Sequence, residues 1–291
     1  IINDPEIDLV IVTSPNTVHF SQAKESLLAG KHVVIEKPFT NTSAEADELI
    51  EISKKAGKIL TAYHNRRFVS DTKTVKKILA SGLIGDVVDF ETHFDRYRPE
   101  PRPVGYWREN SLPGSGIFYD LGSHLIDQAL HLFGLPTAVT AHIKSQRPWA
   151  KADDCFDVKL NYLTHTATLK SSMLANIPGP TFQIHGTKGS FVKYGLDVQE
   201  ENLNKGMIPN TPDWGKEPES IWGKLVTEYN GLKINSVVES ENGDYRDYFI
   251  NLREAILGKT ELAVKPEEAR NVIRVIELAF QSSEEGRTIP F

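Results

Sequence analysis

The feature that most constrains the fold is a regular alternation of apolar strand patterns and amphipathic helix patterns near the start of the chain. The strand patterns cover residues 7–12, 32–36 and 58–63, and the helix patterns cover residues 18–29 and 44–56. The first two strand patterns are nearly continuous apolar runs, which is typical of strands covered on both faces. Short links between alternating strands and helices predict a parallel, doubly wound sheet.

The pattern changes after residue 85. Residues 86–94 alternate between apolar and polar side chains, as an antiparallel strand does. Further expected elements are helices at 71–81, 117–133, 245–257 and 266–285 and several strands within 137–194. Residues 199–243 are rich in Gly, Pro and Asn and predict a long irregular segment. We therefore expect two domains: residues 1–66, the C-terminal part of a Rossmann domain, and residues 67–291, an α+β domain with a large, mostly antiparallel open sheet.

The composition narrows the class of protein. The chain of 291 residues is 40% hydrophobic and 25% charged, as in ordinary soluble globular proteins. Its net charge of -6, without a basic stripe, argues against a nucleic-acid partner. No apolar run approaches the roughly 18 residues of a membrane helix, and the single cysteine, Cys155, excludes an internal disulfide and a thiolate metal cluster. A cytoplasmic protein without a membrane partner is expected.

Polar side chains follow all three predicted parallel strands. The segments are TSPN (13–16), EKPF (36–39) and YHNRRF (63–68). Ligands bind at the carboxyl ends of strands in such sheets. A charged side chain beside a core costs several kcal/mol of stability unless it is paired or has a function. These segments therefore indicate a binding site, with the alternative that Glu36 and Lys37 are ordinary solvated loop residues.

A second group of polar residues lies on one predicted helix. Asp120, His124, Asp127 and His131 follow one another at spacings of four, three and four, which places them on one helix face. A histidine held by a carboxylate is a good proton acceptor for an alcohol. Two alternatives are a solvated amphipathic helix and a shared metal ion, the latter without support from thiolates or an H-E-x-x-H motif.

Together these segments resemble the Gfo/Idh/MocA oxidoreductases, and the resemblance covers nearly all of the chain. The matching segments, in order, are TSPNTVH (13–19), GKHVVIEKP (30–38), YHNRRF (63–68), YWR (106–108) and the D-x-G-x-H-x-x-D pattern of residues 120–127. An E-K-P segment about 80 residues ahead of that pattern, on a strand-then-helix background, is a specific combination. Within the family the chain is most similar to NADP-dependent scyllo-inositol 2-dehydrogenases, for example in RYRPE (96–100) and FQIHGTKGSF (182–191).

The resemblance implies catalytic roles for three residues. The lysine of E-K-P, here Lys37, reaches the nicotinamide and the substrate hydroxyl in this family, where its cation stabilises a developing alkoxide. The family histidine, here His124, takes the hydroxyl proton, and the carboxylate four residues earlier, here Asp120, binds substrate or orients the site. Lys37 and His124 thus handle the proton between them. Pro38 commonly follows a cis peptide bond in the family, so we expect a cis bond between Lys37 and Pro38.

The resemblance also implies residues that contact the cofactor. They come from the three strand ends and from a loop of the second domain: Thr13, Ser14, Pro15, Asn16, His19, Glu36, Lys37, Asn65, Trp107 and Arg108. For Arg66 and Arg67 we favour a salt bridge at the domain junction. Asp127 and His131 are expected to be structural partners, and Tyr97 and Tyr106 are candidates for lining the substrate pocket.

One part of the family pattern is absent from the sequence. The Gly-rich phosphate loop and the residue that reads the ribose 2′ position do not occur in it. They belong to a βαβ unit of roughly 30 residues, which we expect to precede residue 1. The preference for NADP over NAD therefore follows from the resemblance alone.

The leading hypothesis is an NADP(H)-dependent dehydrogenase that transfers a hydride between nicotinamide and a cyclic polyol or sugar, such as scyllo-inositol and its ketone. NAD is the alternative cofactor, and no metal is expected. The alternative function is a sugar- or dinucleotide-sensing regulator of the same fold without turnover, against which the presence of Lys37, Asp120 and His124 argues. A homodimer or homotetramer formed through the second-domain sheet is expected.

Overall fold

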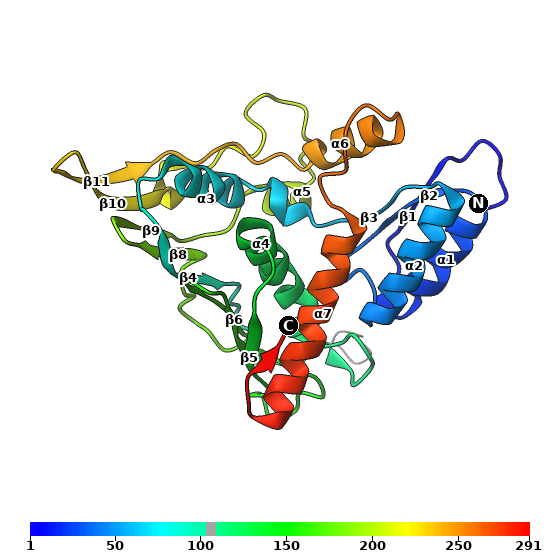
Figure 1. Cartoon of the computed structure of the whole chain (residues 1–291), viewed down its shortest axis with the longest axis horizontal. Helices are drawn as coiled ribbons and strands as arrows, with labels where there is room; N and C mark the ends of the chain where they lie inside the picture. Colours follow the sequence, from blue (N-terminus) through cyan, green and yellow to red (C-terminus); the bar gives the residue numbers. More distant parts are fainter. Residues whose placement is uncertain (103–108) are drawn as a thin grey trace.

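The computed structural model describes residues 1–102 and 109–291, and these residues form two β-sheets (Figure 1). The strands are β1 (Leu9–Val12), β2 (His32–Ile35), β3 (Leu60–Ala62), β4 (Val87–His93), β5 (Ala138–Lys144), β6 (Cys155–Asn161), β7 (Thr166–Ser172), β8 (Phe182–Gly186), β9 (Gly189–Lys193), β10 (Gly223–Tyr229), β11 (Leu232–Val238) and β12 (Ile289–Pro290). The smaller sheet has the order β1-β2-β3, and the larger sheet has the order β11-β10-β9-β8-β4-β7-β6-β5-β12.

Seven α-helices lie within the described residues. They are α1 (His19–Leu28), α2 (Ser43–Ala56), α3 (Ser70–Ser81), α4 (Ser123–Phe133), α5 (Gln199–Asn204), α6 (Arg246–Ile256) and α7 (Pro266–Glu285). Shorter helical turns are η1 (Asn16–Val18), η2 (Asn65–Phe68) and η5 (Glu219–Ile221), all of 3-10 type, and a π-helical turn, η4 (Phe118–Gly122). None of the helices in the described part of the chain combines the length and the apolar character that crossing a membrane requires.

The small sheet is parallel, as the alternating pattern predicts. β1 pairs with β2 and β2 pairs with β3, both in parallel register. Helices α1 and α2 pack against each other beside this sheet (Figure 1). Thr42 is the N-cap of α2 and forms a capping box. Its side chain accepts a hydrogen bond from Glu45 N, and the Glu45 carboxylate accepts one from Thr42 N. The predicted strands and helices of this region are confirmed, with ends that differ by at most two residues.

The large sheet is mostly antiparallel, which confirms the predicted fold class. One expectation was only half right: β4 pairs antiparallel with β8 but parallel with β7. Alternation of apolar and polar residues reports that one face is buried, and it carries no information about the direction of the neighbouring strand.

The expectation of an irregular segment at residues 199–243 is wrong. This segment contains α5 and the β10–β11 hairpin, which extends one edge of the large sheet. The hairpin turns at Asn230 and Gly231, whose φ angles of 50° and 76° are both positive. An Asn-Gly pair with this geometry is the preferred two-residue turn between antiparallel strands.

Helix α7 joins the two sheets. It contacts α2 and β3 on one side and α4 and β5 on the other, so it runs between the small and the large sheet (Figure 1). Pro266 at its first turn and Gly286 in the left-handed conformation just after it mark its ends. Its buried residues, among them Val272, Ile276 and Ala279, belong to one apolar core that is continuous between the sheets.

Candidate active site

The candidate site lies where the three parallel strands end. β1 leads into Thr13–Asn16, β2 leads into Glu36–Pro38, and β3 leads into η2. The carboxyl ends of parallel strands meet at one edge of a sheet, so these segments are neighbours in space. The Lys37–Pro38 peptide bond is cis, which confirms the expectation drawn from the resemblance.

Two buried side chains hold the loop after β1 in place through contacts with backbone carbonyl groups. His19 is 1% exposed, and its Nδ1 and Nε2 lie 2.9 Å from Pro38 O and 2.9 Å from Ser14 O. Asn16 is 2% exposed and donates to Gly114 O at 2.8 Å. Burial lowers the pKa of His19, which favours a neutral ring that donates to one of the two carbonyl groups. His19 and Asn16 therefore fix the loop, whereas Thr13 and Pro15 are exposed and open to a ligand.

Lys37 and Asp120 meet across the edge of the small sheet. Lys37 Nζ donates to Asp120 Oδ1 at 2.6 Å and to the Asp120 carbonyl oxygen at 2.8 Å. Both side chains are largely buried, at 15% and 17% exposure. The alternative that Lys37 is a solvated loop residue is therefore wrong. A partly buried ammonium group beside a carboxylate is suited to bind and polarise a hydroxyl or carbonyl oxygen.

Asp120 is carried by the π-helical turn η4, which continues directly into α4. Gly122 is required in this turn because a Cβ atom there would lie 2.4 Å from the ring of Phe118. π-helical turns inside helices occur frequently at functional sites, where they change the direction of side chains. The turn and the helix together present Asp120 and His124 to the same cavity.

His124 is a buried imidazole that lines the same cavity as Lys37 and Asp120. It is 7% exposed, and its Nδ1 is buried without a hydrogen-bond partner in the described parts of the chain. Burial is the main reason that its pKa is held well below 6.5, and the positive charge of Lys37 lowers it further. The imidazole is therefore neutral near pH 7 and can accept a proton. Because α4 is buried from Ser123 to Ala129, the alternative of a solvated amphipathic helix is wrong.

A cavity of ≈ 350 Å³ brings most of these residues together. Its lining residues are Glu36, Lys37, Asn65, Arg66, Phe94, Arg96, Arg98, Arg102, Asp120, Leu121, His124 and Glu200. All three expected catalytic residues line it, together with Glu36 and Asn65 of the expected cofactor set. Asn65 Oδ1 is buried and has no hydrogen-bond partner among the described residues, so it can accept a hydrogen bond from a ligand. Trp107, Arg108 and Tyr106 lie outside the described residues.

Arg67 forms the salt bridge that was favoured for this position. Its guanidinium group binds Asp127 through Nη2 at 2.6 Å and Glu268 through Nη1 at 2.8 Å. It thereby ties η2 to α4 and α7. Asp127 is thus a structural partner, as expected, and His131 lies 3.3 Å from Lys76 Nζ. Arg66 forms an ion pair with Glu200 at 2.6 Å.

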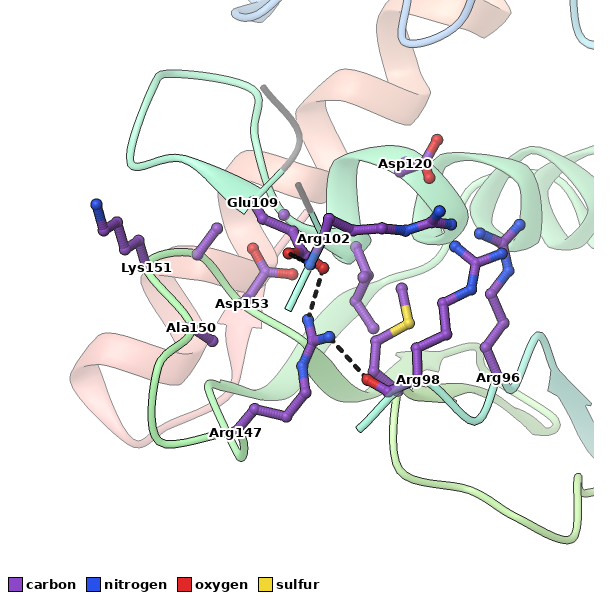
Figure 2. Close-up of a pocket in the computed structure, with 13 residues that line it drawn as sticks. Arg96, Arg98, Arg102, Glu109, Asp120, Arg147, Ala150, Lys151 and Asp153 are labelled. Atoms are coloured by element: carbon purple, nitrogen blue, oxygen red, sulfur yellow. Dashed lines mark hydrogen bonds and ion pairs between the residues drawn. The ribbon is translucent and has the colours of Figure 1, made fainter. Parts of the chain in front are cut away.

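Sequence reasoning missed three arginines. Arg96, Arg98 and Arg102 follow β4 in a proline-containing segment that reads as a loop. Figure 2 shows their guanidinium groups gathered beside Asp120, and all three line the same cavity as Lys37. The backbone of this segment is fixed by Arg147, which donates to Arg98 O at 2.9 Å (Figure 2). Tyr97, a candidate pocket residue, is instead 54% exposed and does not line the cavity.

A buried histidine, His64, was also missed. It is 1% exposed, and its Nε2 lies 3.8 Å from Asp127 Oδ1. Burial lowers its pKa, although the Asp127 carboxylate acts in the opposite direction. No group of three histidine, cysteine or carboxylate side chains in residues 1–102 and 109–291 is arranged to hold a metal ion.

Comparison with known proteins matches the chain to one family. Residues 1–64 match the NAD-binding Rossmann fold of the Gfo/Idh/MocA oxidoreductase family, and residues 76–291 match its C-terminal alpha/beta domain. The scyllo-inositol 2-dehydrogenase (NADP(+)) IolW of Bacillus subtilis is 43% identical over 289 residues, which are 99% of this chain and 80% of that protein. The oxidoreductase YdgJ of Escherichia coli is 42% identical and covers 99% of this chain and 82% of that protein.

Solved structures agree with these matches. The oxidoreductase YvaA of Bacillus subtilis has a TM-score of 0.95 and 42% identity over 100% of this chain and 83% of that chain. The oxidoreductase YPO2259 of Yersinia pestis has a TM-score of 0.93 and 39% identity over 100% of this chain and 81% of that chain.

Proposed function

The chain belongs to the Gfo/Idh/MocA family of oxidoreductases, and from this membership we propose that it is a dehydrogenase that transfers a hydride between NADP(H) and a cyclic polyol or sugar. The observation that carries the proposal is the Lys37–Asp120 pair on the same cavity as a neutral, buried His124. The activity for which the relative IolW is named, with its NADP(+) cofactor, supports a substrate of the scyllo-inositol type.

The residues at the strand ends fit the nicotinamide end of a dinucleotide. Thr13 and Pro15 are exposed on the loop after β1, and Glu36 and Asn65 line the cavity. The buried, unpartnered Asn65 Oδ1 offers an acceptor for an amide donor. When bound, the nicotinamide supplies the hydride chemistry of the reaction. We propose that residues 1–66 hold this end of the cofactor and that residues 67–291 hold the substrate and support assembly through the large sheet.

Lys37 and His124 have different roles at the substrate oxygen in this proposal. The Lys37 ammonium group, held by Asp120, orients the hydroxyl and stabilises negative charge that develops on its oxygen. His124 accepts the hydroxyl proton during oxidation and returns it during reduction. Nδ1 of His124 is enclosed, so Nε2 is the nitrogen that we assign to this transfer.

The test is a spectrophotometric assay of the natural protein, expressed from its complete reading frame. Absorbance of the reduced cofactor is followed with NADP or NAD against a panel of inositols and aldoses, with Lys37→Ala as the control. Turnover that disappears in the control supports the proposal. Tight cofactor binding without turnover of any compound contradicts it and favours a non-catalytic sensor. Light scattering of the same preparation tests the proposed homodimer or homotetramer.

A further inference from the structure

The cavity with the catalytic residues continues into a second cavity of ≈ 380 Å³. Arg66, Phe94, Arg96 and Glu200 line both of them. The second cavity is completed by residues that do not line the first: Asp95, Leu196, Asp197, Glu201 and Asn204. Each cavity alone exceeds the roughly 300 Å³ at which pockets for drug-sized ligands begin. In the proposed function the first cavity holds the nicotinamide and the reacting ring, so a substrate with a single six-membered ring has no part that reaches the residues found only in the second cavity.

The junction between the cavities contains an unused hydrogen-bond donor. Arg66 is 6% exposed, and its Nε is buried without a hydrogen-bond partner in the described part of the chain. A buried donor without an acceptor is unfavourable, so this N–H is an expected contact for a bound molecule. The other end of the guanidinium group pairs with Glu200, whose side chain is 57% exposed. Because the Glu200 carboxylate is mostly exposed, it can turn to a ligand hydroxyl while another ligand oxygen accepts from the buried guanidinium group.

The charges of the two cavities differ in sign. The first is lined by the cations Lys37, Arg66, Arg96, Arg98 and Arg102 and by the acids Glu36, Asp120 and Glu200. The second is lined by the cations Arg66 and Arg96 and by the acids Asp95, Asp197, Glu200 and Glu201. An excess of carboxylates repels a phosphate or carboxylate substituent. Carboxylate, guanidinium and amide groups together suit hydroxyl groups, which both donate and accept hydrogen bonds.

We propose that the second cavity is a subsite for a second, uncharged, polyhydroxylated ring, so that the preferred substrate is a glycoside or a disaccharide. This inference rests on the proposed function, since the first ring is the one oxidised beside Lys37 and His124. The second ring contacts Arg66 Nε and Glu200 at the junction and reaches Asn204 on α5.

The test compares kcat/KM for two matched pairs of one-ring and two-ring compounds, myo-inositol with galactinol and D-glucose with cellobiose. A third comparison, D-glucose with glucose 6-phosphate, tests a charged substituent on one ring. We expect about a tenfold higher kcat/KM for the two-ring compounds and no gain for the phosphate. Asn204→Trp fills the second cavity and should lower the two-ring to one-ring ratio about tenfold, and Glu200→Gln should lower it in the same direction. Asn210→Trp, at an exposed asparagine that lines neither cavity, is the matched control.

The outcomes separate this inference from the proposed function. Oxidation of one-ring polyols with no gain for two-ring compounds overturns the subsite and leaves the function in place. A preference for the phosphate overturns the uncharged character of the second ring. If no compound is oxidised, the proposed function fails, and calorimetric titration with cellobiose then tests the subsite alone. Binding that Asn204→Trp removes and Asn210→Trp keeps supports the subsite, and absence of binding overturns it.

Discussion

The ammonium group of Lys37 lies 2.6 Å from a carboxylate oxygen of Asp120 and 2.8 Å from its carbonyl oxygen, although 83 residues separate the two in sequence. Lys37 follows a strand of the small parallel sheet, whereas Asp120 sits on the π-helical turn that leads into α4. The pair therefore connects the edge of the small sheet to the segment that carries His124. In the proposed function, the substrate oxygen is held at this contact.

Replacing Lys37 should remove most of the activity. Lys37→Ala deletes the cation that stabilises the developing alkoxide, and loss of one such donor costs about 10²–10³ in kcat. We expect a loss of that size in the spectrophotometric assay, measured on variant protein whose unfolding curve shows that it is folded at the assay temperature. Lys24→Ala is the matched control, because Lys24 also pairs at 2.6 Å, with Glu48, but on an exposed surface. Activity of Lys37→Ala above a tenth of the wild-type value would contradict the assigned role.

The pH dependence of alcohol oxidation should report His124. The base must be neutral to accept the hydroxyl proton, so activity is present above its pKa and is lost as the pH falls through it. Because burial holds the pKa of His124 well below 6.5, the acid limb of kcat/KM should lie below pH 6.5. His124→Asn should lower kcat/KM about 10²–10⁴-fold and abolish this limb. An acid limb above neutrality that persists in His124→Asn would show that another group is the base.

Much of the fold could be predicted because its local signals agree with one another. The strand–helix alternation of the small sheet and the helix α7, with Pro266 at its start and Gly286 after its end, carry period and capping signals that point to the same elements. The β10–β11 hairpin was not predicted, for a different reason. The Asn230–Gly231 pair is a sequence signal for its turn, but the surrounding segment is rich in Gly, Pro and Asn residues, which are typical of irregular chain.

The site could be predicted only where a motif marks it. Lys37, Asp120 and His124 belong to motifs that occur together, so the sequence predicts that they share a site, and in the structure all three line one cavity. Arg96 and His64 lie inside the matching segments RYRPE and YHNRRF, but the match assigns no role to either residue. The position of Arg96 on the cavity and the burial of His64 depend on contacts between elements distant in sequence. Single-sequence reasoning cannot supply such contacts, because charged and imidazole side chains are usually solvated in loops.

Arg67 should be essential for stability. Its side chain is 3% exposed and pairs with the side chain of Asp127, which is 1% exposed. Arg67→Met leaves the Asp127 carboxylate buried without its cation, which typically costs about 3–5 kcal/mol. We expect a decrease of that size in the free energy of unfolding measured with urea. Arg270→Met removes an exposed ion pair with Asp47 and should cost no more than about 1 kcal/mol. Equal effects of the two substitutions would refute the difference in burial as the cause.

The buried carboxyl group of Asp71 should make stability fall as the pH rises. Asp71 is 2% exposed, and burial raises its pKa from 3.8 to about 6. Between these values the folded chain binds the proton more tightly than the unfolded chain, so the free energy of unfolding decreases with pH and is level again above pH 6.

In Asp71→Asn the amide oxygen can still accept from Thr72 N, which lies 2.6 Å from Asp71 Oδ1. The difference in unfolding free energy between the variant and the wild type should therefore shift in favour of the variant by about 1–3 kcal/mol from pH 4 to pH 7. Urea titrations at both pH values measure it, with the exposed Asp213→Asn as the control. A difference that is independent of pH would mean that Asp71 is ionised throughout this range in the folded protein.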